Sequence, residues 1–447
     1  MEQKNLLFSK KALNKLIGPL VMEQILAVAV GMIDVIMIAS VGEAAVSGVS
    51  LVDNISILLI GLFSALATGG AVVAGHFLGQ NDEENACRAA NQIVLFVIVS
   101  SVGIMILYLL GRNFILTVVF GKIEEDVMRA ASTYLIITGL SIPGIALYNG
   151  CAALFRAMGN SKITMWISLV MNVLNAAGNA VLIYLVHIGV AGAAIATTFS
   201  RYVAAVTIMI LLFNKNNTIH LDRHFEFRFH RAMIRKILYI GIPTGLENSI
   251  FQLGKILILS LVSVCGTYAI AANAVAGTIG VLNVIPGNAM SLALLSVVSV
   301  CIGADNFEQA RYYTKKLIIK VHIFTGIISA MIILFAPFIV KIYHLSEQTA
   351  SATETLIRMH AVCAMLFWPE SFVLPNTLRA SNDVRFTMGI SIFSMWVFRI
   401  GASYLFVNVF DMNIVGVWMA MFIDWLFRAA VFVTRYIRGR WQSKYTA

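Results

Sequence analysis

The sequence predicts an all-α integral membrane protein with twelve transmembrane helices in two parallel six-helix lobes, related by a pseudo-two-fold axis along the membrane normal. Three observations support this prediction. The composition is too apolar for a water-soluble protein, the chain contains twelve long apolar runs, and it repeats itself with a period of about 224 residues.

The composition identifies lipid as the solvent for most of the chain. Of the 447 residues, 59% are hydrophobic and 12% are charged, whereas soluble domains have about 25% charged residues. The mean hydropathy is +0.86. A net charge of +10 could indicate nucleic acid as a partner. In a membrane protein, however, Lys and Arg collect in cytoplasmic loops beside anionic lipid, so we expect the lipid bilayer and no nucleic acid.

Each apolar run is long enough to cross a bilayer, which takes about 20 residues as a helix. The runs exceed the roughly 9–11 residues of a barrel strand and lack its alternation. The first run continues to Ile38, so we interpret it as a retained span and not as a cleaved signal peptide. The predicted spans lie near residues 13–39, 51–77, 90–111, 131–155, 162–186, 190–213, 237–263, 270–301, 317–341, 356–378, 386–409 and 414–434.

The basic residues predict the orientation. With both termini in the cytoplasm, 23 of the 32 Lys and Arg residues are cytoplasmic, five are outside and four lie within or at the ends of spans. This bias is the one found in multi-pass proteins of the cytoplasmic membrane. We therefore expect an inner-membrane protein with both termini in the cytoplasm and an even number of spans.

The repeat divides the chain into an N-terminal lobe of residues 1–213, a polar cytoplasmic linker of residues 214–236 and a C-terminal lobe of residues 237–447. Each half starts in the cytoplasm and holds six spans, which makes the repeats parallel. The matched positions fall on loops and prolines: Pro19 and Pro243, Glu23 and Glu247, Gly42 and Gly266, Gly79 and Gly303, Gly192 and Gly416, and, one residue out of register, Arg156 and Arg379.

Asp34 is the polar residue that most needs an explanation in the N-terminal half. A carboxylate at the centre of a transmembrane helix costs about 2.5–3.5 kcal/mol on insertion scales, so such an acid indicates function. Asn172, Asn175 and Asn179 share one face of span 5. If that face meets Asp34, the lobe contains a chamber that suits a small cation, and Na⁺ is possible there. Alternatively, the asparagines tie helices together.

Several motifs resemble those of the multidrug and toxic compound extrusion (MATE) transporters. These are Gly-x2-Ala after spans 1 and 7, the turns Leu78-Gly79-Gln80-Asn81-Asp82 and Ile302-Gly303-Ala304-Asp305-Asn306, Leu154-Phe155-Arg156-Ala157-Met158-Gly159-Asn160 with its partner at 378–383, and residues 190–197. The resemblance implies export of organic cations and drugs in exchange for inward H⁺ or Na⁺, without ATP. It also implies that Asp34 and Asn175 bind the coupling cation. Asn179 stands where many members have a second acid.

The C-terminal half has a different charge pattern. Another branch of the family binds its cation through acids in spans 7 and 10, which makes Glu247 and Glu370 candidates for a second site. Glu247 could instead serve hydrogen bonding at a helix end, as its repeat mate Glu23 could. Arg399 is long enough to pair structurally, for example with Asp424. Lys255 lies in the middle of a span and is harder to explain.

These observations predict a secondary antiporter that is not an enzyme, takes no cofactor, holds no structural metal and acts as a monomer. Two alternatives stay open. One is a flippase or exporter of an amphiphilic or lipid-linked metabolite, for which Lys255 and Arg399 would favour anionic cargo. The other is a membrane sensor that transports nothing. The five cysteines have no metal-ligand spacing and are expected to be buried thiols.

Overall fold

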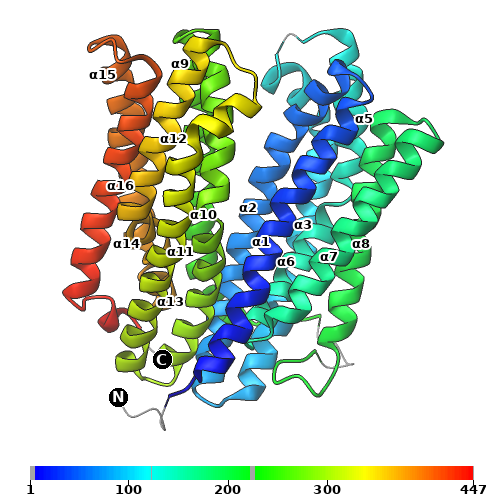
Figure 1. Cartoon of the computed structure of the whole chain (residues 1–447). Helices are drawn as coiled ribbons and strands as arrows, with labels where there is room; N and C mark the ends of the chain where they lie inside the picture. The colour runs from blue at the N-terminus through cyan, green and yellow to red at the C-terminus, as the bar shows by residue number, and fades with distance from the viewer. Residues whose placement is uncertain (1–5, 122, 222–226, 446–447) are drawn as a thin grey trace. The chain divides into compact units, whose positions relative to one another are not determined.

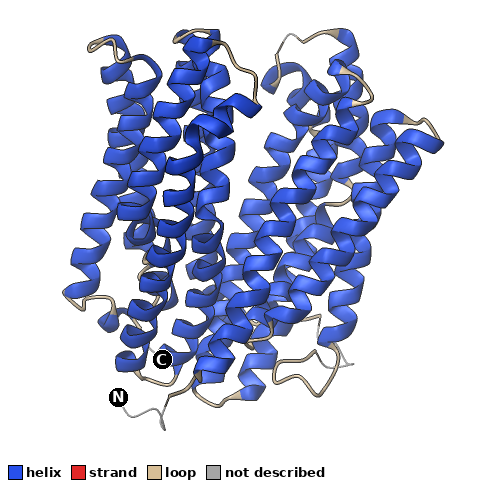
Figure 2. Ribbon diagram, in the orientation of Figure 1, coloured by secondary structure: helices blue, strands red, loops and turns tan. Residues whose placement is uncertain are grey.

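The computed structural model describes residues 6–121, 123–221 and 227–445, and within them the regular structure is entirely helical (Figure 2). The chain forms two compact units. The N-terminal unit is Phe8–Gly245, and the C-terminal unit is Leu246–Ala447 together with Met1–Leu7. The predicted linker, residues 214–236, lies partly outside the described residues, at 222–226.

The N-terminal unit is a helical bundle (Figure 1). Within it α1 packs on α7, α7 on α8, and α2 on both α5 and α6. Its elements are α1 (Lys10–Ala39), α2 (Glu43–Gly79), α3 (Glu83–Leu110), α4 (Arg112–Phe114), the π-helical turn η2 (Ile115–Val119), α5 (Glu125–Gly139), α6 (Ile142–Ala157), α7 (Ser161–Asn179), the π-helical turn η3 (Ala180–Leu185), α8 (Gly189–Leu212) and the first part of α9 (Arg231–Val264).

Two local features show how the sequence builds this unit. Ser9 begins α1 as an N-cap, because its side chain accepts a hydrogen bond from the Ala12 amide. On α2, Gly69 lets the backbone of α9 come close, since a Cβ atom there would collide with the carbonyl oxygen of Ile237. The apolar side chains of Val35 and Ile36 on α1 are 58% and 67% exposed in the isolated chain, as expected for a lipid-facing surface.

The C-terminal unit is a second helical bundle, in which α10 packs on α11 and α12, and α16 packs on α12. Its elements after α9 are α10 (Thr267–Gly303), α11 (Phe307–Ile342), α12 (Glu347–Trp368), the π-helical turn η4 (Pro369–Val373), α13 (Pro375–Ala380), α14 (Val384–Ser394), the π-helical turn η5 (Met395–Gly401), α15 (Ala402–Asn408), α16 (Asn413–Ile437) and the 3₁₀ turn η6 (Gln442–Lys444).

The predicted fold class is confirmed. Among the described residues, ten helices are long and apolar enough to span a bilayer, and an eleventh span forms if α5 and α6, bent by 49°, count together. The remaining predicted span, near 356–378, corresponds to the helical run α12–η4–α13. This run is less apolar than the other ten because it contains charged residues, among them Glu354, Arg358 and Glu370.

The repeat is visible in the geometry of one turn from each unit. Asn81 has φ of 57° and Asp305, its repeat mate, has φ of 52°, so both adopt the left-handed conformation. The next residue caps the following helix in both cases. The Asp82 carboxylate accepts from the Asn85 amide at 3.0 Å, and the Asn306 side chain accepts from the Gln309 amide at 3.0 Å. Equivalent sequence positions therefore form equivalent turns.

Candidate functional site

The N-terminal unit brings Asp34 of α1 together with Asn179 at the end of α7. The Asn179 side-chain Nδ2 donates to Asp34 Oδ1 at 2.9 Å. Asn179 is 1% exposed, and its Oδ1 is buried without a hydrogen-bond donor among the described residues. The pair thus presents a carboxylate and an unused amide oxygen, and hard cations such as Na⁺ prefer oxygen ligands of this kind.

The other two predicted asparagines bond elsewhere. Asn175 Nδ2 donates to Thr197 Oγ1 on α8 at 3.0 Å, and Asn172 Nδ2 lies 3.5 Å from Ser168 Oγ on its own helix. Of the three asparagines, Asn179 is the one whose side chain donates to Asp34. Asn175 instead connects α7 to α8, beside the same chamber.

Asp53 of α2 belongs to the same polar cluster and is missing from the sequence-based set of site residues. Tyr134 of α5 lies close enough to interact with Asp53 and with Thr197. Arg201 of α8 is close enough to attract both carboxylates. We call Asp34, Asp53, Asn175, Asn179, Tyr134, Thr197 and Arg201 the acidic cluster. When both acids are ionised, it carries one negative charge in excess.

One signal in the sequence points to the two charged residues that were missed. Asp53 and Arg201 both lie within or at the edge of apolar runs, where any charge is costly. Pairing them would have required knowing that α2 and α8 meet. The cavity beside Arg201 measures about 10 Å³, close to the minimum of roughly 10–15 Å³ for one water. It can hold one water but no drug, and Arg201 is the one member of the acidic cluster in its lining.

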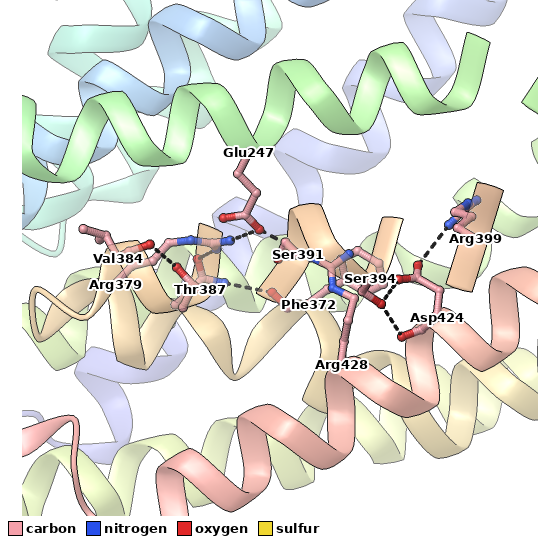
Figure 3. A network of polar contacts seen from close by, with 11 residues as sticks. Glu247, Phe372, Arg379, Val384, Thr387, Ser391, Ser394, Arg399, Asp424 and Arg428 are labelled. Atoms are coloured by element: carbon pink, nitrogen blue, oxygen red, sulfur yellow. Dashed lines mark hydrogen bonds and ion pairs between the residues drawn. The ribbon is translucent and has the colours of Figure 1, made fainter. Parts of the chain in front are cut away.

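Glu247 of the C-terminal unit lies in a buried ion-pair network (Figure 3). Arg379 Nη2 donates to Glu247 Oε1 at 2.8 Å, and Arg428 Nη2 lies 3.4 Å from the same oxygen. Arg428 also donates to Ser391 Oγ at 2.6 Å. Two arginines therefore neutralise this carboxylate. The same position in the N-terminal unit is simpler: Glu23 accepts from Thr164 at 2.9 Å and lies 3.7 Å from Arg156.

The other charged candidates of this unit have separate partners. Arg399 Nη1 lies 3.7 Å from Asp424 Oδ2, and Ser394 donates a short hydrogen bond to Asp424 Oδ1 (Figure 3). Glu370, on the π-helical turn η4, bonds His322 Nε2 at 2.7 Å. Glu247 and Glu370 thus take different partners, two arginines and a histidine, and among the described residues neither is paired with a second carboxylate.

A cavity of about 730 Å³ opens in the C-terminal unit, in the size range of small-molecule sites. Its walls are rich in aromatic side chains, which are Phe251, Trp368, Phe372, Trp418 and Trp425. Its lining also includes Lys255, Arg399 and His360 and contains no Asp or Glu. We call this space the aromatic cavity. Lys255 Nζ lies 5.1 Å from the Phe251 ring centre, and the Arg399 guanidinium carbon lies 5.4 Å from it.

The two sites occupy equivalent positions of the repeat. Adding the repeat period of 224 to five members of the acidic cluster gives five residues that line the aromatic cavity. The pairs are Asp34 with Ile258, Asp53 with Gly277, Asn175 with Arg399, Thr197 with Met421 and Arg201 with Trp425. At the same place in the fold, one unit therefore has two acids with one arginine, and the other has two basic residues, Lys255 and Arg399, and no acid in the cavity lining.

An all-helical, multi-pass protein with charged sites buried inside each of two repeated units is a membrane transporter by its architecture. The MatE family model matches residues 19–181 and again residues 243–405. The chain therefore belongs to the MatE family, the MATE multidrug efflux transporters.

Relatives cover nearly the whole chain. An uncharacterised transporter of Bacillus subtilis, YisQ, is 25% identical over 97% of this chain and 95% of its own length. The probable multidrug resistance protein NorM of Thermotoga maritima is 22% identical over 97% and 94%. A solved structure of an outward-facing multidrug resistance MATE family transporter superposes with a TM-score of 0.90 at 22% identity, over 97% of this chain and 96% of that one.

Proposed function

We propose that this chain is a secondary active antiporter of the cytoplasmic membrane that exports small organic molecules in exchange for inward H⁺ or Na⁺, by alternating access of its two lobes. Both termini lie in the cytoplasm, and the monomer is the working unit. The hydrogen bond from Asn179 to Asp34, within a cluster that also holds Asp53 and Arg201, is the observation that carries the proposal.

The acidic cluster suits reversible binding of one small cation. Arg201 attracts both carboxylates and leaves one negative charge to be neutralised. Asp34 Oδ1 already accepts from Asn179, and the free Asn179 Oδ1 supplies an oxygen ligand on the same helix end. The incoming cation therefore takes the place of the hydrogen bond from Asn179 on Asp34 and does not enter an apolar space. If binding favours a conformer with low substrate affinity, the substrate must in turn weaken cation binding by the same factor.

The exported class has two candidates. The family resemblance and the multidrug resistance names of the relatives support organic cations and drugs. The aromatic cavity favours a second candidate, an exporter or flippase of an anionic amphiphile, because Lys255 and Arg399 line it and no Asp or Glu does. Organic cations and anionic amphiphiles should therefore be compared as substrates in one transport assay.

The coupling role of Asp34 is tested by dye export in vesicles with a pH gradient and a Na⁺ gradient imposed separately. We expect the gradient that drives export in the wild type to have no effect in Asp34→Asn. The matched control is Asp126→Asn, which removes an exposed acid from the first turn of α5. Full gradient-driven export by the Asp34→Asn variant would remove Asp34 from the mechanism.

A further inference from the structure

We propose that the aromatic cavity binds an organic anion with an aromatic or bulky apolar body, and that Lys255 and Arg399 bind its carboxylate, sulfonate or phosphate group. This inference rests on the proposed function as an exporter and specifies its substrate class. It assigns a role to Lys255, which neither the fold nor the buried ion pairs explain.

The charges around the cavity do not balance. Arg379 and Arg428 share the carboxylate of Glu247. Arg399 is paired with Asp424 across a long 3.7 Å separation. With Lys255, this network has four basic side chains and two acids, an excess of two positive charges; Glu370 lies outside it and is bonded to His322. A cationic substrate would add a third charge of the same sign to the site, whereas an anion reduces the excess.

Lys255 is the basic residue with the weakest compensation. Among the described residues it has no carboxylate partner and no hydrogen-bond acceptor within bonding distance; its neighbour is the face of the Phe251 ring, 5.1 Å from Nζ. Arg399 approaches the same ring at 5.4 Å and repels Lys255. Lys255 and Arg399 thus place two positive charges beside one aromatic ring in the cavity lining, and an anionic group can bind between them.

The rest of the lining suits an apolar body attached to that anionic group. Trp368 stacks on Phe372 with ring centres 5.3 Å apart, and Phe372 meets Trp425 edge to face at 5.9 Å. The indole Nε1 of Trp425 is buried without an acceptor among the described residues, so it can donate to an oxygen of the ligand. Trp418 Nε1, by contrast, is already used by Asn273 at 3.0 Å.

The repeat explains why the aromatic cavity differs in charge from the acidic cluster: different residues occupy the equivalent positions. Ile258 and Gly277 stand where the N-terminal unit has Asp34 and Asp53, and Arg399 stands where it has Asn175. The exchange removes two acids, while the base gained at Arg399 offsets the base lost where Trp425 stands in place of Arg201. The aromatic cavity, at about 730 Å³, is large enough for an organic molecule.

Equilibrium binding to the purified full-length protein tests this inference without any gradient. The probes are pyrenebutyrate and the pyrenebutyl-trimethylammonium cation, which share one ring system and differ in charge; quenching of the tryptophan fluorescence reports their binding. We expect the anion to bind at least tenfold more tightly than the cation. Lys255→Met should weaken anion binding about tenfold, which corresponds to about 1.4 kcal/mol, and Lys255→Arg should retain it.

Two controls separate charge at the cavity from other effects. Lys315→Met removes an exposed lysine of α11 that does not line the cavity and should leave binding unchanged. Asp34→Asn should lose gradient-driven export but keep anion binding, so a failure of ion coupling and a failure of the anion site give different results. Binding of neither probe, equal or tighter binding of the cation, or full anion binding by Lys255→Met would overturn the inference.

A lipid could supply the anionic group as well as a soluble metabolite. Repeating the titration in liposomes with and without phosphatidylglycerol distinguishes the two sources. If phosphatidylglycerol lowers the affinity of the wild type for the probe but not that of Lys255→Met, a lipid headgroup is the anion. Equal affinity in both liposomes identifies a soluble organic anion.

Discussion

Arg379 donates to Glu247 across 2.8 Å, and this pair is the counterpart of Arg156 and Glu23, which lie 3.7 Å apart in the N-terminal unit. In the sequence, the acids Glu23 and Glu247 and the arginines Arg156 and Arg379 are two separate matches of the repeat. In the structure they are the two partners of one ion pair, formed once in each unit. In the C-terminal unit the carboxylate also contacts a second arginine, Arg428.

Glu247→Gln should therefore destabilise the C-terminal unit. It leaves Arg379 and Arg428 buried without their shared carboxylate, and removal of one partner of a buried pair costs about 3–5 kcal/mol. Thermal unfolding in detergent measures the loss. Glu354→Gln is the control, because its i,i+4 partner Arg358 is exposed and such pairs contribute at most about 0.5 kcal/mol. Equal loss of stability in both variants would contradict the role of burial.

Asn179→Leu should reduce gradient-driven export about tenfold or more. The substitution removes the amide that donates to Asp34, and a hydrogen bond to a charged group contributes about 1.5–3 kcal/mol. The control is Asn172→Leu, because the amide of Asn172 contacts Ser168 of its own helix at 3.5 Å. Both variants are compared with the wild type in the same vesicles, after their folding is checked by gel filtration. Similar activity of the two would argue against the Asp34–Asn179 pair.

The predicted orientation can be tested through Cys87 on the first turns of α3. We expect a membrane-impermeant maleimide to label this half-buried thiol in inside-out vesicles and not in right-side-out vesicles. A cysteine at Glu124, the exposed N-cap of α5, placed in a Cys87→Ser background, should give the opposite result. Labelling of both positions from the same side would overturn the predicted topology.

Acid should loosen the first turn of α3 and leave that of α11 unchanged. Hydrogen bonds from the Asn85 side chain and amide hold the pKa of Asp82 below its ordinary value of 3.8. Its contribution to the cap is therefore complete above that value and is lost as the pH falls through the lower folded-state pKa. Asn306, the equivalent cap of α11, does not titrate. Relative hydrogen-exchange protection of the two turns measures the difference, and parallel loss in both would contradict the prediction.

Much of the fold is predictable from the sequence because lipid restricts the possible structures. A chain this apolar must form long helices, and the repeat matches at Pro19 and Pro243 set the division into two equivalent halves. The helix starts after two turns are also predictable: Asp and Asn are favoured at the N-cap position, and Asp82 and Asn306 both cap the helices that follow them.

The sites were predictable only in part. The cost of a charge in lipid identified Asp34, and helical periodicity placed Asn179 on the right face. Neither argument could bring Asp53 of α2, Tyr134 of α5 and Arg201 of α8 to the same point, since that depends on how four helices pack. The partners of Glu247 and Glu370 depend on packing in the same way. The roles of all these residues in transport remain predictions.

The excess of negative charge in the acidic cluster and of positive charge at the aromatic cavity has an electrical consequence. Export of one organic anion for each inward H⁺ or Na⁺ moves two charges in the direction that an inside-negative potential favours, with about 2.3 kcal/mol per charge per 100 mV. Exchange of an organic cation for H⁺ moves no net charge. A K⁺ diffusion potential set with valinomycin should therefore drive export of the anion even without an ion gradient of the coupling species, so the membrane voltage itself would power this transporter.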